Sequence, residues 1–104
     1  MSKDQVENIR YQKIQSGEKS GSATAVQLPD IPCRVVAFSA FSTNAGSVWL
    51  GGAGVTVANG TTDTTSGLEL QAGDMTQFIP VDNINVFYII CDNAGDDLTY
   101  LALS

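Results

Sequence analysis

The chain has 104 residues, five Lys and Arg, eleven Asp and Glu, and no His, which gives a formal net charge of −6. Without His, neither a Ser-His-Asp triad nor a Cys-His nucleophile pair can form, and the acidic balance argues against binding to the phosphates of nucleic acids. No apolar run is long enough to span a membrane, and the first ten residues lack the apolar core of a signal peptide. We therefore expect synthesis in the cytoplasm and no contact with a membrane.

Charge divides the sequence into two parts. Residues 1–20 hold four basic residues against three acidic ones, a net charge of +1, whereas residues 21–104 hold Arg34 against eight acidic residues, a net charge of −7. The polar stretch 16–22 is rich in Gly and Ser, which is typical of a flexible joint. The sequence thus predicts an N-terminal arm and joint over residues 1–20 and one domain over residues 21–104.

The predicted arm carries the residues that we expect to contact a partner. Apolar and basic side chains recur there at helical spacing, but a strand from residue 10 to residue 15 fits equally well. A frayed terminus without a role is the third interpretation. The candidate partner-binding residues are Val6, Ile9, Arg10, Tyr11, Lys13 and Ile14.

After the joint, the sequence has the features of a β protein. Gly and Pro interrupt it too often for long helices, and segments 33–41 and 84–91 are rich in β-branched and aromatic residues. The alternation of polar and apolar residues over 83–86 also favours a strand. The predicted strands cover residues 23–28, 33–41, 47–50, 55–58, 68–70, 75–80, 84–91 and 98–103. Eight short strands predict an all-β fold, a single small β-sandwich or jelly-roll-like domain with an extended N-terminal arm.

Three polar segments are interpreted as turns or loops. Segment 51–54 is rich in Gly, but no Lys follows it as in a phosphate-binding loop, so we predict a tight turn or bulge. Asp92, Asp96 and Asp97 suggest calcium, but their spacing lacks the alternation of an EF-hand loop, so we predict a turn with solvated carboxylates. Segment 59–67 contains no apolar residue and is predicted to be an exposed loop.

Other conspicuous side chains are expected in the core rather than in a site. Cys33 and Cys91 lie in the two most hydrophobic predicted strands, so we expect them to be reduced core neighbours, with a disulfide as the alternative. Trp49 is flanked by aliphatic residues and is also expected in the core. Arg34 is expected to pair with a carboxylate, with a place in a subunit interface as the alternative. No nucleophile, base and oxyanion donor combine in the sequence. We therefore expect no enzymatic activity, no cofactor and no metal site.

A series of short motifs runs through the predicted domain. Its parts, in order, are Val-Trp-Leu-Gly at 48–51, Val-Thr at 55–56, Asn-Gly at 59–60, Gly-Asp at 73–74, Asp-Asn at 82–83 and Ala-Gly at 94–95. This order resembles small β-sandwich structural proteins of tailed bacteriophages, over roughly residues 23–103. The Thr- and Ser-rich segment 61–66 departs from the pattern, which has an aliphatic residue soon after Asn-Gly.

The resemblance implies a building block of the virion, made in the host cytoplasm and placed on the capsid exterior. The first expectation is a capsid decoration (cement) protein that binds the major capsid protein or another virion protein through its arm and forms a homo-oligomer, with a trimer favoured. A neck, tail or head-fibre protein is the alternative within the virion. A carbohydrate-binding module is the alternative of another class, suggested by Trp49, Tyr88, Tyr100 and the 59–67 loop.

Overall fold

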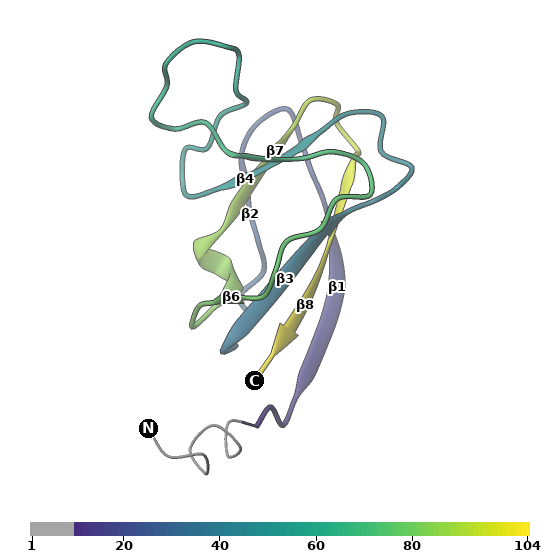
Figure 1. Ribbon diagram of the computed structural model, residues 1–104, viewed down its shortest axis with the longest axis vertical. Coiled ribbons are helices and arrows are strands. Elements are labelled where there is room, and N and C mark those ends of the chain that lie inside the picture. Colours follow the sequence, from purple (N-terminus) through teal and green to yellow (C-terminus); the bar gives the residue numbers. More distant parts are fainter. Residues whose placement is uncertain (1–9) are drawn as a thin grey trace.

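The computed structural model describes residues 10–104, which form two four-stranded antiparallel sheets (Figure 1). One sheet has the order β1-β8-β3-β6 and the other has the order β2-β7-β4-β5. The elements are β1 (Ile14–Ser20), β2 (Val26–Gln27), β3 (Val35–Ala40), β4 (Val48–Gly51), β5 (Leu68–Leu70), β6 (Ile79–Pro80), a 3₁₀ turn (Ile84–Val86), β7 (Tyr88–Cys91) and β8 (Asp97–Leu103).

The strand pairing is nested. β1 pairs with β8, β2 with β7, β3 with β6, and β4 with β5, and all of these pairs are antiparallel. The chain is therefore one long hairpin folded over on itself, with β8 also pairing with β3 and β7 with β4. This is the strand order of a jelly roll, which confirms the predicted all-β sandwich. Within residues 10–104, no helix is long and apolar enough to cross a membrane.

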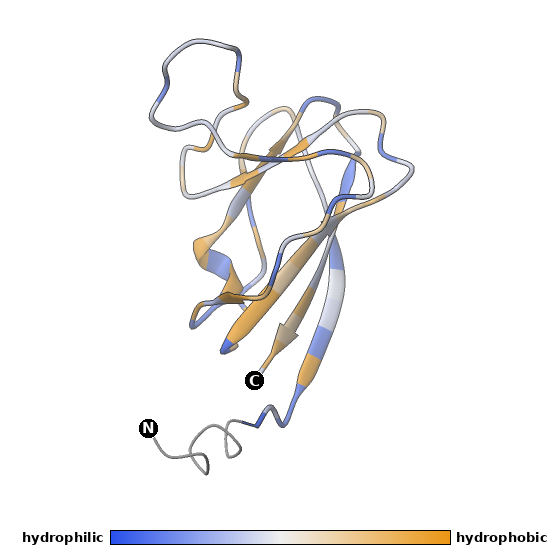
Figure 2. Cartoon of the chain, viewed as in Figure 1, coloured by the Kyte–Doolittle hydropathy of each residue, from blue (hydrophilic) through white to orange (hydrophobic). Residues whose placement is uncertain are grey.

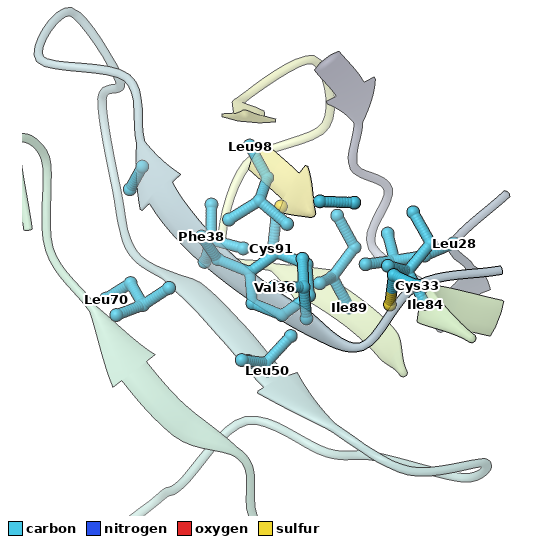
Figure 3. Packing of buried hydrophobic residues seen from close by; sticks show 13 residues of the cluster. Leu28, Cys33, Val36, Phe38, Leu50, Leu70, Ile84, Ile89, Cys91 and Leu98 are labelled. Atoms are coloured by element: carbon cyan, nitrogen blue, oxygen red, sulfur yellow. The ribbon is translucent and has the colours of Figure 1, made fainter. Parts of the chain in front are cut away.

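The core lies between the two sheets and is built by alternation along the strands. On β3, Val36, Phe38 and Ala40 are buried, and the residues between them point to the opposite face. Across the core, the rings of Phe38 and Phe87 meet edge to face with their centroids 5.0 Å apart. Figure 3 shows Phe38, Val36 and Leu98 at the centre of this cluster.

Four predicted strands differ from the observed ones, and the first of them, segment 23–28, shrinks to the two residues of β2. Segment 55–58 contributes only an isolated bridge from Thr56 to Ser66, and segment 75–80 shrinks to β6 and a bridge from Met75 to Ser39. The start of segment 84–91 is a 3₁₀ turn, because the Asn83 side chain accepts a hydrogen bond from the Asn85 N–H at 2.9 Å. A capping side chain thus overrides the polar–apolar alternation.

The prediction of a flexible joint over residues 16–22 is wrong. β1 runs through most of this segment and pairs with β8 from Ile14 opposite Leu103 to Ser20 opposite Asp97. Its glycines permit close packing rather than flexibility. A Cβ added at Gly17 would collide with the Tyr100 hydroxyl, and one added at Gly21 would collide with the Cys91 sulfur. β1 therefore belongs to the sandwich, although the predicted boundary at residue 20 assigns it to the arm.

The packing of Gly21 predicts a specific loss of stability. Replacing Gly21 by Ala should reduce the free energy of unfolding by about 1–3 kcal/mol, because the Cys91 side chain is buried and has little room to move. The matched control is Gly52→Ala, since a Cβ at Gly52 meets nothing within 4 Å. Urea unfolding followed by Trp49 fluorescence measures both variants. Equal stability of the two variants would contradict the tight packing described for Gly21.

Candidate interaction surface

The outer face of the β1-β8-β3-β6 sheet is apolar at its centre. Ser16, Leu101 and Ala37 are paired across three neighbouring strands and form one row on this face. Together with Ser39, Met75 and Phe78 they line a groove of about 770 Å³. We call this surface the apolar groove. Antiparallel sheets with one solvated face normally carry polar residues there, so an apolar centre is unusual.

Small residues form the floor of the apolar groove and large ones form its wall. Ser16, Ala37 and Ser39 are short, whereas Met75 and Phe78 are large and remain 72% and 48% exposed. Leu101 at the centre of the row is 37% exposed. Contiguous exposed side chains of this type are typical of a contact site for another macromolecule.

A β-bulge places the wall of the groove. β3 residues Val36 and Ser39 pair with Ile79 and Met75, so the second strand holds one residue more than β3 between the two pairs. Within the bulge, the Thr76 hydroxyl accepts the Phe38 N–H at 2.9 Å in place of a backbone carbonyl. As a result, the side chains of Met75 and Phe78 are not packed in the core and remain exposed to solvent. They also border a second hollow of about 540 Å³ next to β5.

The strands of this sheet differ in hydropathy (Figure 2). β3 is hydrophobic over nearly its whole length, whereas β1 is mostly polar. A strand with apolar residues on both faces is typical of a strand that is covered on both faces. One face of β3 packs in the core, and the other forms the floor of the apolar groove.

Charged residues lie at both ends of the β1-β8-β3-β6 sheet. Arg10, Lys13 and Arg34 lie at the end where β1 begins and β8 finishes. Glu18, Asp74 and Asp97 lie toward the other end: Glu18 and Asp97 are in the strands themselves, and the Asp74 carbonyl accepts the Ala40 N–H.

The structure describes four of the six predicted partner-binding residues. Val6 and Ile9 lie outside the described residues. Arg10, Tyr11 and Lys13 are exposed and precede β1, and the Lys13 N–H donates to the Ser104 carbonyl at 2.6 Å. Ile14 is the first residue of β1 and is 71% exposed on the same face as the apolar groove.

Arg34 has a different partner from the one predicted. Its guanidinium donates to the Arg10 carbonyl at 3.4 Å rather than to a carboxylate within the described part of the chain. This contact ties the start of β3 to the segment before β1. The stretch that enters β1 is thus held next to the cationic end of the sheet.

The acidic segment 92–97 stabilises a neighbouring turn. Both carboxylate oxygens of Asp96 accept backbone N–H groups, from Ala45 at 3.1 Å and Gly46 at 2.9 Å. Asp92 accepts the Ser47 N–H at 3.1 Å. The prediction of solvated carboxylates is therefore wrong for Asp96, which is 7% exposed. Among residues 10–104, no group of three or more His, Cys, Asp or Glu side chains is placed to hold a metal ion.

The aromatic residues that suggested a sugar-binding face are not arranged as one. Trp49 is 8% exposed, and its indole N–H donates to Asp92 Oδ1 at 2.9 Å. Tyr88 and Tyr100 are half-buried. Segment 59–65 is exposed as predicted, and Figure 1 shows it in a loop that projects from the sandwich. The predicted burial of Trp49 is confirmed, although Trp49 is not part of the cluster that contains Val48 and Leu50.

Both cysteines are buried free thiols at different places in one hydrophobic cluster. Cys33 lies near Leu28 and Ile84 at one end, away from Cys91 (Figure 3), so the prediction that the two cysteines are neighbours in the core is wrong. Burial raises the pKa of the Cys33 thiol, and the negative charge of Asp82 raises it further. Burial also raises the pKa of Cys91 to about 11, with a further contribution from Asp96, Asp92 and Asp97. Neither sulfur is therefore an activated nucleophile.

The residues that line the apolar groove were not predicted from the sequence as a binding surface. Comparison of the chain with protein-family models, with curated proteins and with solved structures found no match. A signal for the groove exists at the outward positions of the two central strands, where Ala37 and Leu101 replace the expected polar residues. That signal can be recognised only when the residues of β3 and β8 that face the core have been identified.

The raised pKa of Cys91 predicts that stability falls at high pH. Above pH 9 the thiol ionises in the unfolded chain, but in the folded protein it stays protonated up to about pH 11. Stability is therefore lost as the pH rises through this window, by up to about 2–3 kcal/mol from this group. The difference in unfolding free energy between wild type and Cys91→Ala should shrink from pH 9 to pH 11. A constant difference would disprove the shift.

Proposed function

We propose that this protein is a non-enzymatic structural component of a tailed-phage virion, a capsid decoration protein that binds the outside of the head. In this proposal the N-terminal segment contacts the major capsid protein, and copies of the protein associate with one another. The observation that carries the proposal is the exposed apolar groove, which lies on the same sheet face as Ile14, where the N-terminal segment enters the domain.

Three features of the domain support a structural role. The resemblance to phage β-sandwich proteins covers most of the chain. Jelly rolls are frequent in viral capsid proteins, although this fold also serves other functions. All buried side-chain nitrogen and oxygen atoms among residues 10–104 have hydrogen-bond partners, which favours a rigid building block.

The N-terminal segment offers a way to bind a neighbouring subunit. Val6 and Ile9 supply apolar contacts, and extended segments commonly bind by adding a strand to a partner's sheet. Residues 12–20 already pair with the end of the chain that contains β8, so the proposal assigns this binding to the residues before Gln12. Several linked copies would raise the binding strength through effective concentration.

The test is deletion of residues 1–9, which leaves β1 and its pairing with β8 intact. We expect the truncated protein to fold but no longer to co-sediment with phage heads that lack the protein. The matched pair Val6→Ser/Ile9→Ser and Ser2→Ala/Asn8→Ala separates apolar contacts from chain length, and only the first variant should lose binding. Unchanged binding of the truncated protein would reject the role of this segment.

A neck, tail or head-fibre protein is the second candidate, because the same apolar face and N-terminal segment would serve there. The two locations differ in copy number, with hundreds of copies per particle on a head and a few at a neck or tail. Quantitative gel densitometry of purified particles distinguishes them. The carbohydrate-binding alternative has lost its main support, since Trp49 is buried.

A further inference from the structure

We propose that Asn59 is a site of spontaneous modification, at which the side-chain amide is lost as ammonia and the residue becomes aspartate or isoaspartate. The chain itself supplies the reacting groups, and water is the only co-reactant. This inference is independent of the proposed function, because it concerns the exposed loop 59–65 and involves neither the apolar groove nor the N-terminal segment.

The position of the Asn59 side chain is the first argument. The reaction begins when the backbone nitrogen of the next residue adds to the side-chain carbonyl carbon Cγ. Asn59 Oδ1 accepts the Thr61 N–H at 3.1 Å, and the ring that this hydrogen bond closes contains both Asn59 Cγ and the Gly60 nitrogen. The side chain is therefore folded back over the atom that attacks it, and such closeness raises the rate of an intramolecular step.

Gly60 leaves the attacking nitrogen accessible. It has no Cβ to shield the nitrogen, and its φ of 86° is a conformation that residues with a side chain rarely adopt. Within residues 10–104, the Gly60 N–H donates no hydrogen bond that would have to break first. Asn59 and Gly60 are both exposed, so hydroxide and water reach the reacting atoms.

Two donors face the oxygen on which negative charge develops. When the nitrogen adds to Cγ, Oδ1 becomes an oxyanion, and Oδ1 already accepts the Thr61 hydroxyl at 2.6 Å as well as the Thr61 N–H. Hydrogen-bond donors that are in place before the reaction stabilise such a charge. Thr61 is thus the residue that activates the Asn59 amide.

A second turn in the same loop shows that this arrangement stabilises a negative charge. Asp63 Oδ1 accepts the Thr65 N–H at 2.9 Å and the Thr65 hydroxyl at 2.7 Å, which are the same two kinds of donor in the same sequence relation. These hydrogen bonds, the backbone one first, lower the pKa of the Asp63 carboxyl group. A carboxylate formed at position 59 meets equivalent donors from Thr61.

The modification consists of ring closure followed by hydrolysis. Hydroxide removes the Gly60 N–H proton, the nitrogen forms a bond to Asn59 Cγ, and the bond from Cγ to Nδ2 breaks as Nδ2 takes a proton from water and leaves as ammonia. Water then opens the cyclic imide. Breaking the new bond between Cγ and nitrogen gives aspartate, whereas breaking the original peptide bond gives isoaspartate, which lengthens the backbone by one carbon. Either product adds a negative charge to the loop.

The other asparagines lack these features. Each of them precedes a residue that has a side chain, so only Asn59 is followed by Gly. Asn44 is also held on both sides of its amide, because Nδ2 donates to the Asp97 carbonyl at 2.8 Å and Oδ1 accepts the Asp97 N–H at 2.9 Å. Asn83 caps the 3₁₀ turn. These two residues are internal controls for Asn59.

Ageing of the full chain in mildly alkaline buffer tests the site. We expect a mass gain of about 1 Da, which peptide mass spectrometry locates at Asn59, while Asn44 and Asn83 stay unchanged. The rate should rise with pH, because base removes the Gly60 proton. Enzymatic methylation of isoaspartate measures the second product. An unmodified Asn59, or an earlier change at another Asn, would overturn the proposal.

Three variants separate the local arrangement from the Asn-Gly pair alone. Thr61→Val removes the hydroxyl donor and should slow the loss of the amide about three- to tenfold, which is less than for a buried oxyanion donor because water reaches the loop. Thr61→Ser keeps a hydroxyl and should retain the wild-type rate. Thr65→Val is the matched control, since it removes the corresponding hydroxyl at Asp63 and should leave the rate at Asn59 unchanged. Equal rates for Thr61→Val and the wild type would refute the activating role of Thr61.

Discussion

The pairing of the first described strand with the last is the constraint on which the rest of the structure depends. β1 pairs with β8 over all seven of its residues, and β8 pairs on its other side with β3. This ladder closes the nested hairpin and brings distant parts of the chain side by side, from Ile14 opposite Leu103 to Ser20 opposite Asp97. Without β1, β8 would be an exposed edge with unpaired backbone groups, and the row through Ser16, Leu101 and Ala37 would be incomplete.

The same ladder explains how polar residues serve the fold. The β1 sequence IQSGEKS contains little that buries well, yet its backbone hydrogen bonds and the closeness of Gly17 to Tyr100 hold it in place. The acidic residues have a comparable structural use. The carboxylates of Asp92 and Asp96 accept hydrogen bonds from backbone N–H groups in the turn before β4, and Asp92 also accepts one from the Trp49 indole. These carboxylates are thus stabilised by N–H donors rather than by basic side chains.

One sheet face therefore carries the properties that a partner would recognise. The bulge at Met75 places large, exposed apolar side chains beside a floor of small ones. The N-terminal segment enters at the cationic end, where Arg34 contacts the Arg10 carbonyl.

Local composition and hydrophobicity were enough to predict the all-β class, the burial of Trp49, the two buried free thiols and the exposed loop at 59–65. The sequence did not reveal β1, since a polar strand is held by pairing with β8 and not by its own pattern. It placed a strand at Ile84–Val86, where the Asn83 side chain instead caps a 3₁₀ turn. The tertiary structure alone decided which apolar residues face outward. Strand pairing and the bulge at Met75 set the side on which Ala37, Leu101 and Phe78 lie, and both depend on contacts distant in the sequence.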